Sequence, residues 1–177
     1  MLEWTTGFFT KKEVDSPRLS AELLLSHVLQ QPRIKLYTDY ERALTEPQLS
    51  AFRALVKRAG EQEPIAYLTG KAHFFNLELE VCPGVLIPRP DTETLVESAI
   101  GYARGEPGLE APRILDLCTG SGCIAAALAK NLPTAVVLAI DKSERAAAVA
   151  KKNMASLGLA DRVTVACGDL FAPLAEI

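Results

Sequence analysis

The sequence predicts an α/β protein with a small N-terminal helical bundle, a linking β-hairpin and the first half of a Rossmann-like parallel sheet. Two observations support this prediction. Apolar residues at helical spacing recur before Gly60. From Arg113 onward, apolar strand-like runs alternate with helical segments, the order that builds a parallel sheet through right-handed crossovers. We therefore expect the bundle over residues 1–62, the linker over 63–90 and the α/β domain over 91–177.

Two helices of the bundle have recognisable starts. Ser16 precedes Pro17, the order typical of a helix N-terminus. Thr45 and Gln48 have the spacing of a capping box, which places the start of another helix there. Each start is followed by an apolar stripe at helical spacing, Ala21, Leu24, Leu25 and Val28 in the first and Leu49, Phe52, Val56 and Ala59 in the second.

The linker is expected to contain the hairpin. Apolar and acidic residues alternate from Leu77 to Val81, as in a half-buried strand. Pro83-Gly84 is a turn signal that leads into Val85–Ile87, so we predict that these two segments pair. The segment 88–93 follows, and in it Asp91 or Thr92 is predicted to cap the next helix.

The segment around Gly120 and Gly122 reads as a buried strand, a sharp turn and an apolar helix. Such a turn brings backbone close to a nucleotide-like ligand, and glycine leaves the ligand room. Two cofactor classes fit. Residues 120–125 match a loose dinucleotide fingerprint, with Asp141 about 20 residues on. Asp116, however, resembles the acid of the D-x-G-x-G-x-G loop of S-adenosylmethionine-dependent methyltransferases, with Cys118 in place of its first glycine. A carboxylate suits a cationic, amino-acid-bearing ligand better than a pyrophosphate, so the methyltransferase interpretation is favoured.

Two further strands end in acids. The apolar run 135–140, expected to be covered on both faces, precedes Asp141, and the strand 163–167 precedes Asp169. Carboxyl ends of parallel strands share one edge, so Asp116, Asp141 and Asp169 are predicted to lie on one rim, where Asp141 can accept ribose hydroxyl hydrogens. The alternative is that the three acids are independent turn caps.

Net charge, the length of the apolar runs and cysteine spacing argue against several classes of protein. A net charge of −3 argues against a broad nucleic-acid surface. No apolar run reaches the ~18 residues of a membrane span, and no signal peptide is recognisable, so a cytoplasmic protein with no membrane partner is expected. The four cysteines lack metal-ligand spacing, so no metal site is predicted.

Four segments together resemble the HemK/PrmC family of protein-(glutamine-N5) methyltransferases, which modify peptide chain release factors. These segments are Pro64–Gly70, Val85–Glu93, Ile114–Gly122 and Gly168–Phe171. The resemblance covers nearly the whole chain. It implies a class I methyltransferase sheet, S-adenosylmethionine as cofactor, the glutamine of a release factor Gly-Gly-Gln motif as methyl acceptor, and a monomer when full length. The helical bundle is implied to recognise the release factor.

The resemblance also implies which residues bind the cofactor. Residues 118–122, that is Cys118, Thr119, Gly120, Ser121 and Gly122, would surround its methionine part. Asp116 is the carboxylate expected to bind this cationic cofactor. Asp141 would bind the ribose, and Asp169 with Leu170 would line the adenine. Arg89 and Pro90 belong to the segment that would close over the cofactor.

The family's Asn-Pro-Pro-Tyr motif does not occur in the 177 residues. In the family that motif holds the amide hydrogens of the acceptor glutamine, whose nitrogen is a poor nucleophile and must be aimed at the methyl group. We therefore expect no catalytic residue in this chain, and we expect the chain to be an inactive fragment. The alternatives are a nucleic-acid adenine-N6 methyltransferase relative, a nicotinamide-dependent oxidoreductase and a non-catalytic release-factor-binding module.

Overall fold

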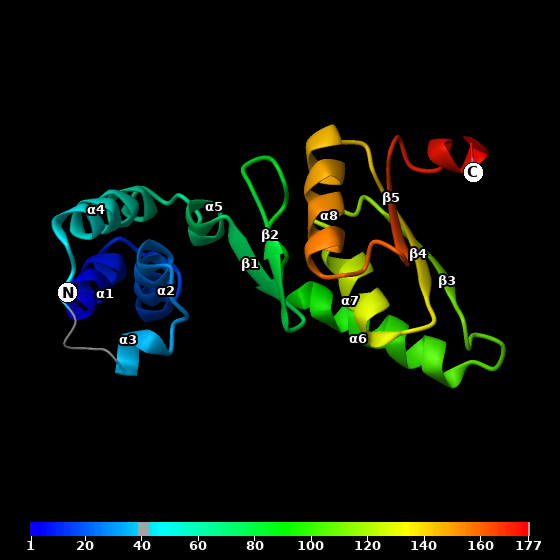
Figure 1. Cartoon of the computed structure of the whole chain (residues 1–177), viewed down its shortest axis with the longest axis horizontal. Coiled ribbons are helices and arrows are strands. Elements are labelled where there is room, and N and C mark those ends of the chain that lie inside the picture. The colour runs from blue at the N-terminus through cyan, green and yellow to red at the C-terminus, as the bar shows by residue number, and fades with distance from the viewer. Residues whose placement is uncertain (39–42, 177) are drawn as a thin grey trace. The chain divides into compact units, whose positions relative to one another are not determined.

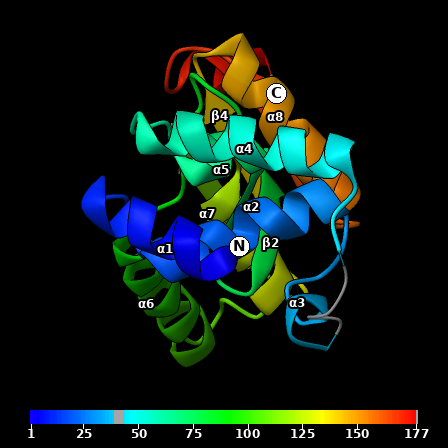
Figure 2. The same ribbon diagram turned by 90° about the vertical axis from the view of Figure 1, so that its left-hand side faces the viewer.

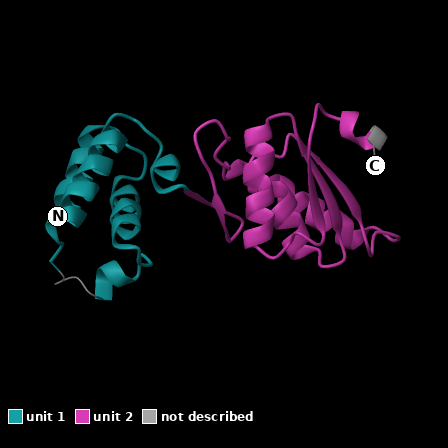
Figure 3. Cartoon of the chain, turned by 45° about the horizontal axis from the view of Figure 1, so that its top comes forward, with its two compact units in different colours: residues 1–70 teal, residues 71–177 magenta. Residues whose placement is uncertain are grey.

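The computed structural model describes residues 1–38 and 43–176. It divides into two compact units, Met1–Gly70 and Lys71–Ile177 (Figure 3), and Ile177 itself lies outside the described residues. Each unit has a hydrophobic core of its own, so the two are described separately. The finer division into 1–62, 63–90 and 91–177 remains a prediction.

The first unit consists of helices (Figure 1). They are α1 (Leu2–Lys11), α2 (Pro17–Leu29), α3 (Lys35–Thr38), α4 (Glu46–Gly60) and α5 (Ile65–Thr69). Figure 2 views α1, α2 and α4, which pack against one another. Their apolar stripes meet in a core that contains Phe9, Leu24 and Phe52, each at most 2% exposed. The two predicted stripes are therefore confirmed as buried faces.

Both predicted helix starts are confirmed, although they differ in detail. At α4, Thr45 N donates to Gln48 Oε1 (3.0 Å) and Gln48 N donates to Thr45 Oγ1 (3.5 Å), which is a complete capping box. At α2, Ser16 is the N-cap, but its side chain makes no capping hydrogen bond. The short helix α5 was not predicted as a helix.

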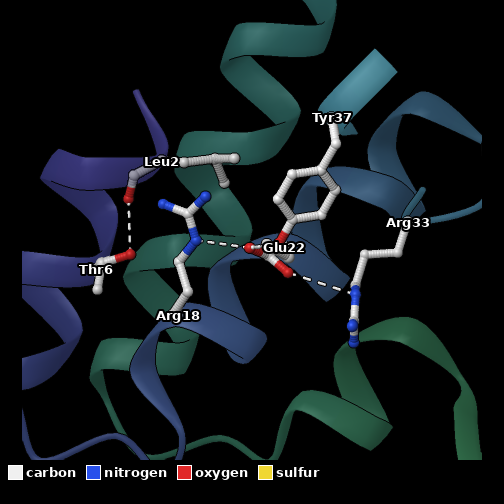
Figure 4. Close-up of polar contacts among 6 residues, drawn as sticks. All are labelled: Leu2, Thr6, Arg18, Glu22, Arg33 and Tyr37. Atoms are coloured by element: carbon white, nitrogen blue, oxygen red, sulfur yellow. Dashed lines mark hydrogen bonds and ion pairs between the residues drawn. The ribbon is translucent and has the colours of Figure 1, made fainter. Parts of the chain in front are cut away.

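Helix α3 has no buried residue of its own. It is attached to α2 through the buried carboxylate of Glu22. Arg18 Nε and Tyr37 Oη donate to Glu22 Oε1 at 2.6 Å and 2.5 Å, and Arg33 Nε lies 3.4 Å from Oε2 (Figure 4). Burial opposes the charged form, but the hydrogen bonds from Tyr37 and Arg18 outweigh it and lower the pKa of Glu22. The ionised Glu22 therefore fastens α3 to α2.

The second unit opens with a β-hairpin. Its strands β1 (Lys71–Phe74) and β2 (Leu77–Glu80) pair antiparallel. The two turn residues, Phe75 and Asn76, have φ of 49° and 61°. Positive φ at both central positions is the requirement of a two-residue type I′ turn, and Asn tolerates it well. The sequence signal for this hairpin is therefore Phe75-Asn76.

The predicted pairing of residues 77–81 with Val85–Ile87 is wrong. Val85–Ile87 forms no strand, and its first residue instead donates its N–H to Cys82 O at 3.0 Å to close a turn. Pro88 and Pro90 follow directly, and proline has no N–H for a strand ladder. The turn at Pro83-Gly84 thus exists, but it does not join two strands.

Helix α6 (Asp91–Gly105) begins without a side-chain cap. Its N-cap position is Pro90, and the predicted capping by Asp91 or Thr92 is wrong because both lie inside the first helical turn. Glu93, also in that turn, accepts a hydrogen bond from Phe75 N at 2.9 Å through Oε1. The start of α6 is therefore tied to the turn of the hairpin.

The sheet of the second unit is parallel, in the order β3-β4-β5. The elements are β3 (Arg113–Leu117), α7 (Cys123–Asn131), β4 (Val136–Asp141), α8 (Glu144–Ser156), β5 (Val163–Cys167) and the 3₁₀ helix η1 (Ala172–Glu176). Because the strands are parallel, their carboxyl ends lie at one edge. The predicted β-α-β-α-β order is confirmed.

Among the described residues, helices cover only one face of this sheet (Figure 1). The strands step across the sheet in one direction, so right-handed crossovers place α7 and α8 on the same side, where they pack against each other. Val137 and Ala139 face these helices and are fully buried, whereas Val136 is 54% exposed and Leu115 38% exposed. The expectation that residues 135–140 are covered on both faces is therefore wrong for the described part of the chain.

Candidate functional site

The glycine loop joins β3 to α7, and three of its residues have left-handed backbone: Cys118 (φ 60°), Gly120 (59°) and Gly122 (80°). A Cβ at Gly120 would meet nothing within 4 Å, so the space beside this residue is open. A Cβ at Gly122 would lie 2.8 Å from Met154 Cε, which shows that α8 packs directly against the loop. The loop thus has one open side and one side supported by α8.

Asp116 lies one residue before the end of β3 and is 7% exposed. Thr119 Oγ1 donates to Asp116 Oδ2 at 2.6 Å. Burial raises the pKa of Asp116, the bond from Thr119 opposes this rise, and the charge of Asp141 adds to it. A cation placed beside Asp116 would offset the cost of burying its charge.

Asp141, the last residue of β4, uses both carboxylate oxygens to hold backbone. Gly120 N donates to Oδ2 at 2.8 Å, and Ser143 N donates to Oδ1 at 2.9 Å. The first of these bonds ties the glycine loop to the neighbouring strand. Asp141 therefore positions the loop, a role that the sequence analysis did not foresee.

The remaining predicted residues are more exposed. Asp169 follows β5 by two residues and pairs with Lys142 Nζ at 2.8 Å, next to Asp141. Leu170 is 49% exposed and has φ 48°. Arg89 and Pro90 are exposed on the segment before α6, and within the described residues no hydrogen bond or ion pair links the Arg89 side chain to the glycine loop. The structure thus brings Asp116, the loop and Asp141 together, with Asp169 at the same sheet edge.

One buried residue at this site was missed by the sequence analysis. Asn153 of α8 is 0% exposed and donates from Nδ2 to Ser121 O (2.8 Å) and to Glu80 O (3.0 Å), while its Oδ1 accepts from Glu80 N (2.7 Å). It joins the glycine loop to strand β2. In the sequence, the one hint of burial is its position between the apolar residues Ala150 and Met154 of a helical segment.

The site suits S-adenosylmethionine, whose sulfonium group is cationic and whose ribose carries two hydroxyls. The open side of Gly120 leaves room for a ligand on the backbone, and the buried Asp116 provides negative charge. The Ser121 side chain is buried beside the Cys123 thiol.

A separate cavity of ≈ 470 Å³ lies in the first unit, between α1 and α4. Its lining residues are Met1, Trp4, Thr5, Phe8, Leu49, Phe52, Arg53, Val56 and Lys57, and we call it the bundle groove. Trp4 is 68% exposed and stacks on Phe8, with ring centroids 5.6 Å apart. Thr5 Oγ1 is buried without a partner, and neither Arg53 nor Lys57 forms an ion pair among the residues described. The bundle groove is therefore apolar, with two uncommitted cations.

We also searched residues 1–38 and 43–176 for a metal site, a membrane-spanning helix and a reactive cysteine. Those residues contain no cluster of three or more His, Cys, Asp or Glu suited to a metal ion, and none of their helices has the length and apolar character of a membrane span. Burial raises the pKa of the Cys123 thiol, which disfavours the reactive thiolate.

Comparison with known families defines the class of protein. Residues 114–176 match the family described as "Methyltransferase domain", and residues 1–70 match the "PrmC N-terminal domain". The first match covers the glycine loop, Asp141 and Asp169. Residues 114–176 thus match a methyltransferase domain, a class that uses S-adenosylmethionine.

Curated proteins similar to this chain are named release factor glutamine methyltransferases. The release factor glutamine methyltransferase of Rhodopirellula baltica is 48% identical over 97% of this chain, and that of Chlorobaculum tepidum is 46% identical over 92%. The chain is a homologue of the release factor glutamine methyltransferases, which confirms the predicted resemblance. It spans 58% and 56% of the length of these two relatives.

Solved structures similar to this chain include two S-adenosylmethionine-dependent methyltransferases in complex with S-adenosyl-L-homocysteine. One, from Geobacter sulfurreducens, is 34% identical, with a TM-score of 0.36 over 46% of this chain and 30% of that chain. The other, from Thiobacillus denitrificans, is 30% identical, with a TM-score of 0.36 over the same shares.

Proposed function

We propose that the protein transfers a methyl group from S-adenosylmethionine to the side-chain amide nitrogen of the glutamine in the Gly-Gly-Gln motif of release factors, in the cytoplasm. The observation that carries the donor half is the loop from Asp116 to Gly122, open on one side at the carboxyl edge of parallel strands. The acceptor half is supported by the names of the relatives and by the PrmC-type match of residues 1–70.

When bound, S-adenosylmethionine supplies an electrophilic methyl group on a sulfonium. In our proposal Asp116 provides the negative charge beside that cationic ligand, and Gly120 lets it lie against the backbone. Asp141 accepts the ribose hydroxyl hydrogens with lone pairs that its two backbone bonds leave free. Asp169 and Leu170 line the adenine, and Arg89 with Pro90 covers the ligand.

A pair of matched glycine variants tests the donor site. Gly120 and Gly158 both have left-handed φ, and a Cβ at either would meet nothing within 4 Å, but only Gly120 borders the proposed site. We expect Gly120→Ala to weaken binding of S-adenosylmethionine by about tenfold or more, because the methyl group occupies ligand space. Gly158→Ala carries similar backbone strain and should leave binding unchanged. Calorimetric titration with S-adenosylmethionine and, separately, with NAD⁺ gives the readout. Binding of the dinucleotide alone would refute the proposal.

We further propose that the bundle groove receives an apolar segment of the release factor that carries acidic residues. Its apolar lining suits such a segment, and the unpaired Arg53 and Lys57 supply complementary charge. Reversing both charges, with Arg53→Glu and Lys57→Glu, should weaken binding of a purified release factor by at least about tenfold. Lys130→Glu, a charge reversal on α7, is the control. Equal effects of the two changes would argue against the bundle groove.

We infer that residues 1–177 bind the donor but do not transfer its methyl group by themselves, because they contain no Asn-Pro-Pro-Tyr motif. Transfer of labelled methyl to a release factor by this chain would contradict that inference. The bundle groove also favours a second function, a non-catalytic release-factor-binding module. That function predicts release factor binding without any donor binding.

A further inference from the structure

Asn153 makes an unusual set of contacts for one side chain. An asparagine amide offers two N–H donors, and both are used, one by the loop residue Ser121 and one by the hairpin residue Glu80. Its oxygen accepts a third bond, from Glu80 N. The two partners lie 32 and 73 residues earlier in the chain. One buried amide on α8 thus joins two segments that no ladder connects.

Two other side chains of α8 contact the end of β2 and the turn that follows it. Arg145 Nη1 donates to Pro83 O at 2.9 Å, and Lys152 Nζ lies 2.5 Å from Glu80 Oε2. Neither of these side chains is bonded to the glycine loop within the described residues. What Asn153 adds to these contacts is the bond to Ser121.

That bond acts at the end of the loop, where α7 begins. Ser121 O belongs to the peptide that precedes Gly122, the left-handed residue (φ 80°) from which α7 starts. Glycine does not fix its own conformation, so the orientation of this peptide must be set by contacts. A bond to a buried amide carries more weight than one to an exposed group, because a buried carbonyl left without a partner is costly.

We propose that Asn153 is a positioning residue for the donor site. It fixes the Ser121 peptide of the glycine loop and couples that loop to the hairpin. The hairpin turn is itself bonded to Glu93 at the start of α6. The role in donor binding rests on the function proposed above. The coupling itself does not, and it can be measured without a ligand.

Hydrogen exchange of the donor-free chain tests the coupling. Asn153→Asp keeps the shape and the acceptor for Glu80 N but removes the donors to Ser121 O and Glu80 O. We expect the Gly122 amide, which is bonded to Thr119 O, to exchange about tenfold faster in this variant. Arg145→Ala removes a bond between α8 and the turn after β2 that does not involve the loop, and it should leave the Gly122 amide unchanged. Equal rates in all three proteins, or equal acceleration in both variants, would overturn the proposal.

Asn153→Ser, which adds no buried charge, replaces Asn153→Asp if the latter does not fold. Donor binding then supplies the functional readout, with S-adenosylhomocysteine as the probe. Saturating probe should slow exchange of the Glu80 amide in the wild-type chain, and this slowing should be absent in the Asn153 variant. Slowing confined to the loop would refute the coupling. If the wild-type chain binds no probe, the inference that residues 1–177 bind the donor fails, and the donor-free comparison still decides the role of Asn153.

Discussion

Cys118 occupies a left-handed backbone position, φ 60°, in the glycine loop. Left-handed φ costs a non-glycine residue roughly 1–2 kcal/mol, whereas glycine loses more entropy on folding. We expect Cys118→Gly to change the free energy of unfolding by less than about 1 kcal/mol, because the two effects oppose each other. Cys118→Val should lose about 1–2 kcal/mol, since β-branched residues fit this region worst.

Urea denaturation measures both changes at Cys118. Cys167→Val is the matched control, because Cys167 is also exposed but lies in β5, where valine is favoured. A loss at Cys167 as large as that at Cys118 would show that the left-handed backbone is not the cause.

The ionised carboxylate of Asp116 should lower the free energy of unfolding near neutral pH, although the same charge favours ligand binding. Its pKa is raised in the folded protein, so folding favours the protonated form. The stability that Asp116 contributes is therefore largest at low pH and falls as pH rises through its unfolded and then its folded pKa. We expect Asp116→Asn to stabilise the chain more at pH 7 than at pH 3.5 and to weaken S-adenosylmethionine binding by about tenfold or more.

Urea denaturation at the two pH values, together with calorimetry, checks the prediction for Asp116. The exposed Asp161→Asn is the control and should have little effect on either quantity. If Asp116→Asn gave the same change in unfolding free energy at both pH values, burial of the charge would not be its cause.

The residues of the glycine loop could be predicted from the sequence, but the hydrogen bonds that Asp141 and Asn153 make to the loop could not. Asp116, Gly120 and Gly122 stand close together in sequence, so a local pattern suffices to find them. The bond from Gly120 N to Asp141 and the bonds of Asn153 join residues 21 to 73 positions apart. Such contacts depend on how the elements pack, which periodicity does not specify.

Among the elements, the hairpin shows how turn chemistry decides pairing. Proline and glycine at 83–84 are a strong turn signal, yet the strands meet at Phe75-Asn76, which has the positive φ values of a type I′ turn. A phenylalanine at such a position is unusual, so composition pointed to the wrong turn. The helix starts were easier to predict, because the capping box at Thr45 is local in sequence.

The attachment of α3 should depend on pH through Glu22. The pKa of Glu22 is lowered in the folded protein, so its contribution to stability is present above its unfolded pKa and is lost as pH falls through the folded pKa. We expect Glu22→Gln to cost about 1–2 kcal/mol at pH 7, discounted because Arg18 and Arg33 are half exposed. The cost should shrink toward pH 3.

Urea denaturation at pH 7 and pH 3 measures this cost. Glu63→Gln removes the exposed pair with Arg58 and should destabilise less. A Glu22→Gln cost that did not vary with pH would contradict the assigned role of the ionised carboxylate.

The two units have separate hydrophobic cores. We therefore expect a substitution in one core to destabilise that unit and to leave the stability of the other unchanged. Phe52 is 2% exposed in the core of the bundle. Phe52→Ala should destabilise the first unit by about 3–5 kcal/mol through lost burial and a cavity. Hydrogen exchange should then accelerate in α2 and α4, while the amides of β4 keep their protection. Parallel loss of protection in β4 would show that the units unfold together.

The uncovered face of the parallel sheet should make the protein visible to environment-sensitive dyes. Val136 and Leu115 expose apolar side chains on the sheet face opposite α7 and α8, and exposed apolar surfaces bind amphiphilic aromatic probes such as anilinonaphthalene sulfonate. We expect the native chain to enhance the fluorescence of this dye, and Val136→Thr with Leu115→Thr to reduce the enhancement. Unchanged fluorescence would place the dye elsewhere. Detergent below its micellar concentration should compete with the dye for the same surface. Detergent in a storage buffer would therefore cover this face and weaken the binding of any partner to it.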